Sequence, residues 1–573
     1  MTKRNINQAL SNSKQWWKNI KKLTKQANSA GTINKKRFIN EQWMTTPQFL
    51  ESQNKYYNTL AGNSVIDPPQ FATSGQLSPI SIGLVKSRHK LIDTSKSNHS
   101  HDFPSWISKC YHEDIAPPLT NIINCMLSTL TFPSRWKNAE IVPLPKTSNP
   151  SVSKDFRPIS LLWHCGKVAE YFVSQQLKAK TAAKLTTSQY AYTDGVGCVD
   201  ALVDALSYWT KHLDAKDNIC IQSAFVDFSK AFDMMNPTIL DAKLENLCVN
   251  SSLRKLINSF LTDRAACVAD RTTGERSAEL IVSRGVPQGA ILGPPLWSIY
   301  INDLPTEISS CSPSCSTTIY ADDVTTYRPM YKQETQFQTI SHRSRLTPIS
   351  PLQPAINAIH NWSQNTDMML NTAKTKTMNI SPSLNIKSDL GLNVNSDIIE
   401  EVSEFKLLGV IIDKHLSFSS HVDSIHSRAR SRLNALLTLK RYGVEKSSLL
   451  RFYLANVRSV LSYAAPAWFS YLSDTNKNRL ESIQRQCLRI IYPDIPYEDR
   501  LLSANIPSLC NYLSCICMTF VFDVASDPQH RLHKHLPKRQ SSTGRHSTRL
   551  RDAPIVCNNY RVTKNSLFSK YSI

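Results

Sequence analysis

The stretch TTIYADDVTTY, from Thr317 to Tyr327, places two adjacent carboxylates inside a segment that otherwise favours a strand. β-Branched residues such as Ile319 and Val324 fit a pleated, half-buried surface. Asp322 and Asp323 interrupt that run, so the segment predicts two short strands joined at or near the Asp pair. Because two like charges side by side repel each other, the pair indicates either a solvated turn or a site that holds a cation.

A further carboxylate ends another apolar strand. The segment CIQSAFVDFSKAFDMM, residues 220–235, opens as a buried strand and turns polar at Asp227, about ninety residues before the Asp pair. If the two strands are neighbours in one antiparallel sheet, the three carboxylates converge at one edge. Oxygen ligands suit Mg²⁺, and two such ions clamp the oxygens of an in-line phosphoryl transfer. An isolated Asp-Asp pair is more often only a turn, so the metal interpretation depends on neighbouring motifs.

The positive charge of the chain is concentrated at its ends. A length of 573 residues predicts three or four domains, and the hydrophobic share of 41% supports packed cores. The net charge is +22; residues 1–40 contain ten Lys or Arg and no acidic residue, and residues 527–573 contain ten basic and two acidic ones. Such ends favour a polyanion such as nucleic acid, and solvated tails are the alternative.

Membrane and metal signals are weak. We find no run of eighteen apolar residues and no signal peptide, so we expect an intracellular protein without a membrane segment, in either nucleus or cytoplasm. The fourteen cysteines lack zinc-like spacing and indicate free thiols in a reducing compartment. His530, His533 and His535 are interpreted as surface residues.

The order of predicted elements indicates an α+β fold with an antiparallel sheet rather than a βαβ barrel. Residues 1–80 are polar and linker-like apart from a short basic helix around Trp16 and Trp17. Apolar periodicity and turn residues predict helices at 114–130, 163–180, 200–214, 237–247, 352–369 and 421–443, and strands within 139–162, 220–226, 317–327, 375–381 and 405–413.

Taken in order, these segments resemble the reverse transcriptase motifs of non-LTR retrotransposons, most closely the jockey-like elements. The stretches that carry the resemblance are VPLPKTSNPSVSKDFRPISLL, AFVDFSKAFD, RGVPQGAILGPPLWSIYINDLP, YADD, LNTAKTKTMNIS and FKLLGVIIDKHLSFSSHV. It covers roughly residues 75–500, since SVLSYAAPAWFSYL is similar to the helical region that follows the polymerase in these elements. Ala290, Pro295 and Trp297 depart from the Ser, Leu and Phe that the family usually has.

The resemblance implies a catalytic centre with two Mg²⁺ ions, or Mn²⁺ as an alternative. Asp227, Asp322 and Asp323 would be catalytic metal ligands, with the carbonyl of Phe228 as a further oxygen donor. Lys374 would donate a proton to the leaving pyrophosphate.

The resemblance also implies the nucleotide site. Lys146 and Arg157 would bind the triphosphate, and Gln288 and Gly289 would support nucleotide and template. Phe232 would lie under the sugar and exclude a 2′-hydroxyl, which selects deoxynucleotides.

The fold that the resemblance implies is a right hand with fingers, an antiparallel-sheet palm and a helical thumb, followed by a helical basic C-terminal region. We expect a basic, partly disordered N-terminal segment (1–80), a helical lead-in (81–126), the reverse transcriptase domain (127–412), a thumb and connection region (413–525) and a basic tail (526–573).

A helix at 421–443 would carry Val422, Ile425 and Leu433 on one face, with Arg428 and Arg432 largely elsewhere. As a thumb helix it would lie along the phosphates of a template–primer duplex, where contacts position rather than specify. An ordinary amphipathic helix with a solvated face is the alternative.

The function we expect is RNA-directed DNA polymerase, with an RNA template, a DNA primer and dNTPs as partners. An RNA-dependent RNA polymerase is disfavoured by Phe232, and a catalytically inactive retroelement-derived protein that only binds nucleic acid is the second alternative. Related elements carry an endonuclease ahead of the polymerase, and the first 120 residues are too short for one, so nicking would require a separate endonuclease.

Overall fold

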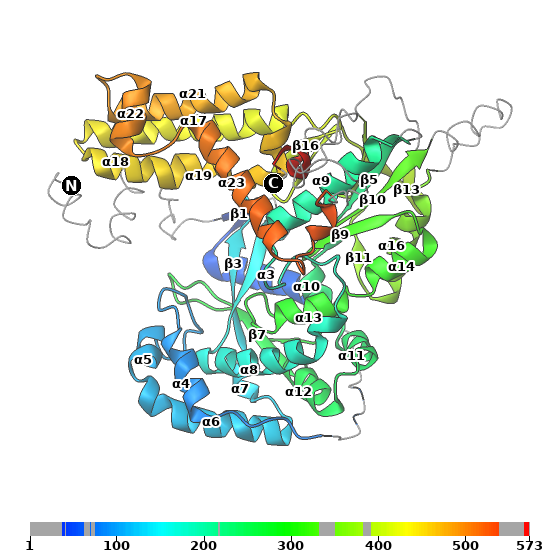
Figure 1. Cartoon of the computed structure of the whole chain (residues 1–573). Helices are drawn as coiled ribbons and strands as arrows, with labels where there is room; N and C mark the ends of the chain where they lie inside the picture. The colour runs from blue at the N-terminus through cyan, green and yellow to red at the C-terminus, as the bar shows by residue number, and fades with distance from the viewer. Residues whose placement is uncertain are drawn as a thin grey trace, which may run out of the picture.

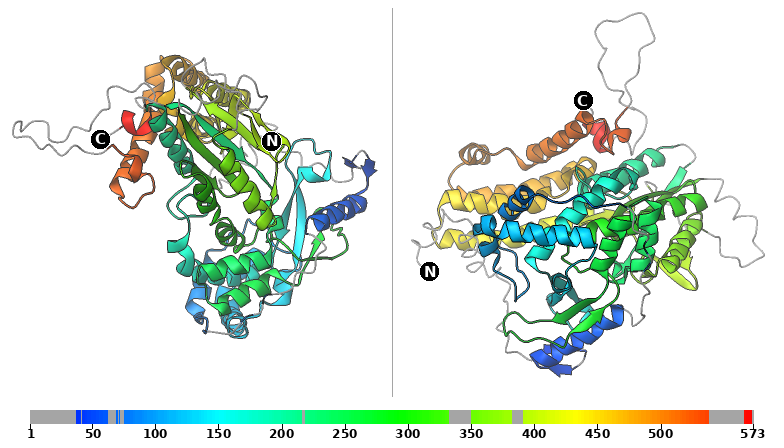
Figure 2. Two further views of the ribbon diagram at one scale, coloured as in Figure 1. Left: turned by 90° about the vertical axis from the view of Figure 1, so that its right-hand side faces the viewer. Right: turned by 90° about the horizontal axis from the view of Figure 1, so that it is seen from below.

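The computed structural model describes residues 37–40, 42–61, 69, 71, 75–215, 218–331, 350–381, 391–537 and 566–571. Figures 1 and 2 show a central sheet with helices on both faces, a second sheet beside it, and a layer of long helices from the C-terminal third of the chain. The helix expected around Trp16 and Trp17 and most of the basic tail lie outside the described residues.

The central sheet carries the candidate palm. Its strand order is β13-β14-β12-β5-β10-β9. Its strands are β5 (Asn218–Val226), β9 (Ser316–Tyr320), β10 (Asp323–Tyr331), β12 (Lys376–Ile380), β13 (Leu392–Val394) and β14 (Asp397–Glu401). All neighbouring pairs are antiparallel except β12 and β14, which run parallel. The expected antiparallel sheet is therefore confirmed with one exception, which arises because the second strand of the β13–β14 hairpin, not the first, lies beside β12.

Strand β5 alternates its side chains between two cores, as the pleat requires. Ile221 and Phe225 pack with α9 (Cys198–Leu213) and the C-terminal helices, whereas Ala224 and Val226 pack with α13, α14 and α16. These three helices span Gly293–Tyr300, Leu304–Cys311 and Gln353–Asn365. The sheet is thus covered on both faces, which explains why its strands are so apolar.

A second sheet, of order β4-β3-β7-β8, forms the candidate fingers. Its strands are β3 (Ala139–Pro145), β4 (Phe156–Leu161), β7 (Arg264–Val268) and β8 (Leu280–Val282). The helices near it and near the palm are α4 (Ile82–Lys90), α5 (Ser105–Cys110), α6 (His112–Thr129), α7 (Ser134–Lys137), α8 (His164–Thr181), α10 (Ala231–Met234), α11 (Pro237–Asn246) and α12 (Ser251–Leu261).

Part of the expected N-terminal linker is folded. Strands β1 (Arg37–Ile39) and β2 (Gln42–Met44) form a hairpin, and helix α3 (Thr46–Ala61) packs against the second sheet. Phe49 and Leu50 are buried in one cluster with Phe156 and Val268 of the sheet. The linker interpretation was wrong for this part because a few apolar residues within a polar sequence suffice to dock one helix.

The C-terminal third is helical, as expected. The short strand pair β15–β16 (Glu404–Leu407, Val410–Asp413) precedes these helices, and another short pair, β6–β11 (Phe228–Ser229, Met369–Leu370), lies beside the palm sheet. The helices are α17 (Ser419–Arg441), α18 (Lys446–Phe452), α19 (Ser459–Ser462), α20 (Ala465–Trp468), α21 (Asp474–Ile491), α22 (Tyr497–Ala504), α23 (Leu509–Ser526) and α24 (Leu567–Lys570). The apolar face predicted for α17 is buried.

Helix α23 is long and apolar enough to cross a membrane, judged by length and composition only. It is the one such helix in the described part of the chain. One of its faces is buried against the protein core through Leu513, Cys517 and Val521, while Met518 and Phe522 are exposed.

A buried glutamate connects α8 to the loop that precedes α13. Glu170 is 1% exposed, and its Oε2 accepts hydrogen bonds from the backbone N–H groups of Ile291 (2.6 Å) and Leu292 (3.1 Å). Burial raises the pKa of the Glu170 carboxyl to about 7, although those two hydrogen bonds favour the charged form. The residue therefore has a structural role.

The raised pKa predicts a pH-dependent stability. The unfolded chain releases this proton near the ordinary value of 4.5. Folding is thus most favoured below that pH, and this contribution is lost as the pH rises through about 7. Glu170→Gln keeps an acceptor but cannot titrate. Relative to this variant, the wild type should lose up to about 1.4 kcal/mol of unfolding free energy per pH unit in that window.

Urea unfolding of both proteins at several pH values from about 4.5 to 8 measures the difference. The exposed Glu401→Gln serves as the control, because it changes a carboxylate outside the core. Parallel stability curves for Glu170→Gln and wild type would contradict the assignment.

Candidate active site

The β5–β10 ladder places the predicted acidic residues side by side. Val226 pairs with Val324 in the antiparallel register. Asp227 follows Val226, and Asp323 precedes Val324, so the two aspartates occupy opposed positions where the ladder ends. Residues opposed in an antiparallel pair have Cβ atoms about 5 Å apart.

The turn between β9 and β10 is strained. Tyr320 pairs with Asp323, which leaves Ala321 and Asp322 as a two-residue connection. Ala321 has φ +57°, a region that residues with a Cβ rarely adopt. Its N–H donates to Gln189 Oε1 (3.1 Å), and its carbonyl accepts from Gln189 Nε2 (3.3 Å) and Trp297 Nε1 (2.8 Å). Two buried side chains therefore hold both backbone polar groups of the strained residue.

The carboxylates repel one another. Burial, and then the charge of Asp227, raises the pKa of Asp322, while Arg157 and Lys374 oppose the shift. Removal from water, and then the charges of Asp322 and Asp227, raises the pKa of Asp323 to about 6. This edge of the sheet has more negative charge than its surroundings neutralise.

Asp227 is half-buried, and one of its carboxylate oxygens has an incomplete set of partners. Its Oδ2 is buried and accepts no hydrogen bond from the described residues, and Lys374 Nζ lies 3.3 Å from it. A buried, under-coordinated carboxylate oxygen among repelling acids fits a cation ligand. In the described part of the chain, no three His, Cys, Asp or Glu side chains are grouped closely enough to hold a metal ion.

The three predicted cations share the same region. Lys146 comes from the loop after β3, Arg157 from strand β4, and Lys374 from the loop before β12. Burial lowers the pKa of Lys146, and the charges of Lys374 and Arg157 lower it further. Lys146 Nζ donates to the carbonyl of Lys154 (2.7 Å), while Arg157 is exposed. A cluster of cations therefore faces the acidic edge.

Phe232 lies beside the Ala321–Asp322 turn. Its ring centroid is 5.3 Å from that of Trp297 and 6.4 Å from that of Tyr192. The charge of Asp322 contributes to a raised pKa of Tyr192, which places this ring near the acids as well. Trp297, which departs from the usual Phe, thus contacts Phe232 with its ring and the turn with its N–H.

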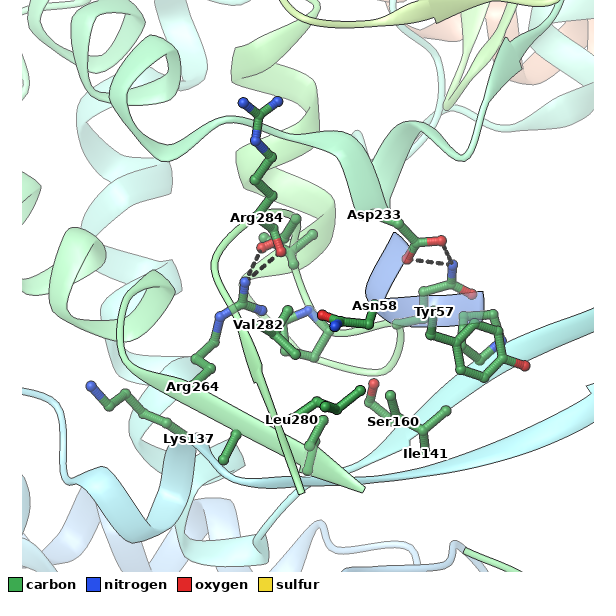
Figure 3. Close-up of a pocket in the computed structure, with 18 of the residues that line it drawn as sticks. Tyr57, Asn58, Lys137, Ile141, Ser160, Asp233, Arg264, Leu280, Val282 and Arg284 are labelled. Carbon is green, nitrogen blue, oxygen red and sulfur yellow. Dashed lines mark hydrogen bonds between the residues drawn. The ribbon is translucent and has the colours of Figure 1, made fainter. Parts of the chain in front are cut away.

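Gln288 is held by a carboxylate that the sequence analysis did not select. Its Nε2 donates to both oxygens of Asp233 (2.9 and 3.1 Å), as Figure 3 shows. Burial raises the pKa of Asp233 to about 6. Gln288 also accepts a hydrogen bond from the Ser160 N–H (2.8 Å), so strand β4 fixes its backbone.

The loop around Gln288 requires two glycines. Gly285 has φ +73°, and a Cβ there would lie 2.5 Å from the Asp233 carbonyl oxygen. Gly289 has φ +131°, and a Cβ there would lie 2.7 Å from the Ser160 carbonyl oxygen. The buried Arg264 donates to the carbonyls of Arg284 (2.6 Å) and Gly285 (2.7 Å). A cavity of about 80 Å³ under this loop is lined by residues of α3, β3, β7 and β8 (Figure 3).

A larger cleft, of about 470 Å³, lies between the acidic edge and the β15–β16 hairpin. Asp227, Asp323 and Lys374 line it on the palm side, and Phe405 and Leu408 on the other side. The Tyr463 hydroxyl donates to the Leu408 carbonyl (2.8 Å), so a C-terminal residue holds the hairpin turn.

Three predicted residues remain: Phe228, whose predicted role uses its backbone carbonyl, and Arg428 and Arg432 of α17. Phe228 is buried, and its backbone pairs with Leu370 beside Asp227. Arg428 is exposed on α17, whereas the Arg432 guanidinium donates to the Asn456 carbonyl. The duplex-binding role of these two arginines stays a prediction.

Sequence reasoning missed Asp233, Gln189 and Lys230, whose Nζ lies 2.6 Å from the Tyr56 hydroxyl of α3. Asp233 lies inside the quoted AFVDFSKAFD motif, so its position was a usable signal. Gln189 stands in no pattern that marks it, because Ala321, which its side chain holds, is 132 residues away.

Residues 144–412 match the family described as "Reverse transcriptase (RNA-dependent DNA polymerase)". The chain is 26% identical over 378 residues to the RNA-directed DNA polymerase from mobile element jockey of Drosophila melanogaster, covering 65% of this chain and 39% of the relative. It is 25% identical over 484 residues to the probable RNA-directed DNA polymerase from transposon BS of the same species, covering 82% and 50%. The match to the X-element polymerase of that species is 25% over 380 residues, covering 65% and 39%.

The chain therefore spans half or less of the length of these curated relatives. Among solved structures, telomerase from Candida albicans with a fragment of telomeric RNA is similar over 70% of this chain and 68% of that chain, with 12% identity and a TM-score of 0.36. The family match, together with the palm and fingers sheets, confirms the predicted right-hand fold: this chain carries a reverse transcriptase domain homologous to the RNA-directed DNA polymerases of the jockey, BS and X-element non-LTR retrotransposons.

Proposed function

We propose that the chain is an RNA-directed DNA polymerase that extends a primer 3′-hydroxyl with deoxynucleotides on an RNA template. The observation that supports it best is the acidic edge formed by Asp227, Asp322 and Asp323, faced by Lys374 and Arg157. Negative charge opposite positive charge suits a triphosphate bound through cations. The fingers and palm would be residues 127–412, and the thumb and connection residues 413–525.

Reverse transcriptases depend on divalent metal ions. The chemistry of these residues fits that requirement, since Asp227 has a buried oxygen that accepts no hydrogen bond from the described residues and the other two carboxylates repel each other. The three acids do not form a closely grouped set in the described part of the chain, so a bound ion would have to draw them closer. We propose Mg²⁺, with Mn²⁺ as an alternative, held by the three aspartates and the Phe228 carbonyl. Two such ions, when bound, would favour deprotonation of the primer hydroxyl and neutralise charge on the phosphates.

The side chains of the protein would do the remaining work. Arg157 and Lys146 would bind the triphosphate and withdraw negative charge from it in the transition state. Lys374 would leave its contact with Asp227 and donate a proton to the departing pyrophosphate. Gln288, oriented by Asp233, would present its amide to the nucleotide, while the backbone at Gly289 approaches the template.

The proposed centre makes the acidic turn essential for extension. Asp322→Asn removes one charge while keeping shape, so primer extension should fall by at least about a hundredfold because charge stabilisation is lost. Binding of the primed template should change by less than about twofold, since phosphate contacts supply most of that affinity. Extension of a DNA primer on an RNA template, with and without Mg²⁺, and a binding titration measure the two effects.

Lys211→Gln on α9, in a pocket that none of the three aspartates lines, is the control for a single charge change. Equal extension by Asp322→Asn and wild type would refute the proposed centre. Tight, salt-dependent binding by the wild type without any Mg²⁺-dependent product would instead favour the inactive nucleic-acid-binding alternative.

The proposed function also predicts which residue selects the sugar. The Phe232 ring contacts Trp297 and borders the turn, so its removal opens space beside a bound sugar. Phe232→Ala should lower the preference for deoxynucleotides over ribonucleotides by about tenfold or more. The ratio of kcat/KM values for dNTP and NTP measures it.

Phe232→Tyr, which keeps the ring, is the matched control and should retain selection. An unchanged ratio in Phe232→Ala would show that another residue selects the sugar. A wild type that prefers ribonucleotides would favour an RNA polymerase.

A further inference from the structure

The strained turn of Ala321 is held by a segment that is itself held from the far end of the chain. We call residues 186–193 the clamp segment. Besides the Gln189 side chain, its backbone bonds to β9, because Tyr190 N–H donates to the Ile319 carbonyl (2.9 Å) and Ile319 N–H donates to the Ser188 carbonyl (2.8 Å). The clamp segment therefore follows the catalytic hairpin closely.

The opposite side of the clamp segment is bound by Arg531. Its Nη1 donates to the carbonyls of Thr187 (2.9 Å) and Gln189, and its guanidinium lies 5.4 Å from the centre of the Tyr190 ring. One guanidinium thus fixes two carbonyls that flank Ser188. Arginine suits this task because its planar fork loses little freedom for each hydrogen bond that it forms.

Arg531 belongs to a segment that is firmly attached to α9. We call residues 527–537 the C-terminal strap; it follows α23 and lies beside α9 (Figure 1). Leu532 is fully buried. Anchoring contacts to α9 are His530 Nε2 to Asp200 Oδ1 (3.4 Å), Lys534 Nζ to Asp204 Oδ1 (2.9 Å) and His535 Nε2 to Asp204 Oδ1 (2.6 Å). The two histidines therefore contribute to an intramolecular contact, contrary to the expectation of surface residues.

We propose that the C-terminal strap is a positioning element of the polymerase centre: Arg531 holds the clamp segment, Gln189 and Trp297 hold Ala321, and the turn aims Asp322 and Asp323. A non-glycine residue at positive φ persists only where its surroundings over-determine it. Here three hydrogen bonds with side chains do so, two with Gln189 and one with Trp297. The expected effect on primer extension rests on the proposed function, whereas the contacts that hold the turn rest on geometry alone.

The test uses the full chain and three arginine variants. Arg531→Ala removes both carbonyl contacts, and Arg531→Lys keeps a donor without the fork. Arg485→Ala is the matched control, since its guanidinium also stacks on a tyrosine (Tyr497, 4.9 Å) in the C-terminal region. Trp297→Phe tests the other end, because it keeps a large ring and removes only the N–H donor to Ala321.

Two readouts are needed. Hydrogen–deuterium exchange reports on the backbone amides of the clamp segment and of residues 316–327, and it does not depend on activity. Steady-state primer extension gives kcat and the KM for dNTP. Arg531→Ala should exchange faster in both segments and lose about tenfold in kcat, the size of one charge-assisted hydrogen bond, with KM changed less than about twofold.

Arg531→Lys should fall between Arg531→Ala and wild type, and Trp297→Phe should lower kcat with similar KM. Arg485→Ala should match the wild type in both readouts. If Arg531→Ala and Arg531→Lys leave the exchange of residues 316–327 unchanged, the proposal is overturned. A wild type that extends no primer would refute the proposed function, while the exchange data would still decide whether the strap holds the turn.

Discussion

The ladder between β5 and β10 is the constraint on which the site depends. Both strands lie inside the central sheet, so their side chains are buried on both faces and their register is strongly fixed, because a shift by one residue would exchange the two faces. That register, with Val226 opposite Val324, forces Asp227 and Asp323 together at the end of the ladder. Apolar packing therefore supplies the free energy that holds mutually repelling carboxylates in one place.

Around the ladder, too, the packing of the fold holds residues in conformations or environments that are unfavourable by themselves. Ala321 sits at positive φ, Gly285 and Gly289 press against neighbouring backbone, and the Asp233 carboxyl is buried with a raised pKa. Each feature opposes folding by itself. They cluster around the residues proposed to act on the nucleotide, which is where local preferences and the fold are expected to disagree.

How far the sequence predicted this structure depends on the range of the interactions. Strong periodicity predicted β5, α9 and the buried face of α17, since these patterns need only neighbouring residues. The parallel β12–β14 pair and the docking of α3 were missed, because topology and a few apolar contacts decide them.

The same limit applies to the site. The acidic motif was legible because Asp227 and the Asp pair stand at strand ends, and the family resemblance supplied roles for them. The residues that orient the motif could not be predicted from the sequence, because Asp233 holds Gln288 from 55 residues away and Gln189 holds Ala321 from 132 residues away. No local pattern distinguishes such residues from ordinary polar ones.

The matched family region, residues 144–412, is consequently smaller than the unit that shapes the cleft. On the N-terminal side, Tyr56 of α3 contacts Lys230 through a hydrogen bond and through its ring. On the C-terminal side, Tyr463 holds the turn of the β15–β16 hairpin, which borders the cleft opposite Asp227. A fragment cut at the family boundaries would keep every proposed metal ligand and lose these supports. Since a catalytic geometry is useful only when its supporting contacts fix it, the structural unit of the proposed polymerase centre extends at least from α3 to the strap that follows α23.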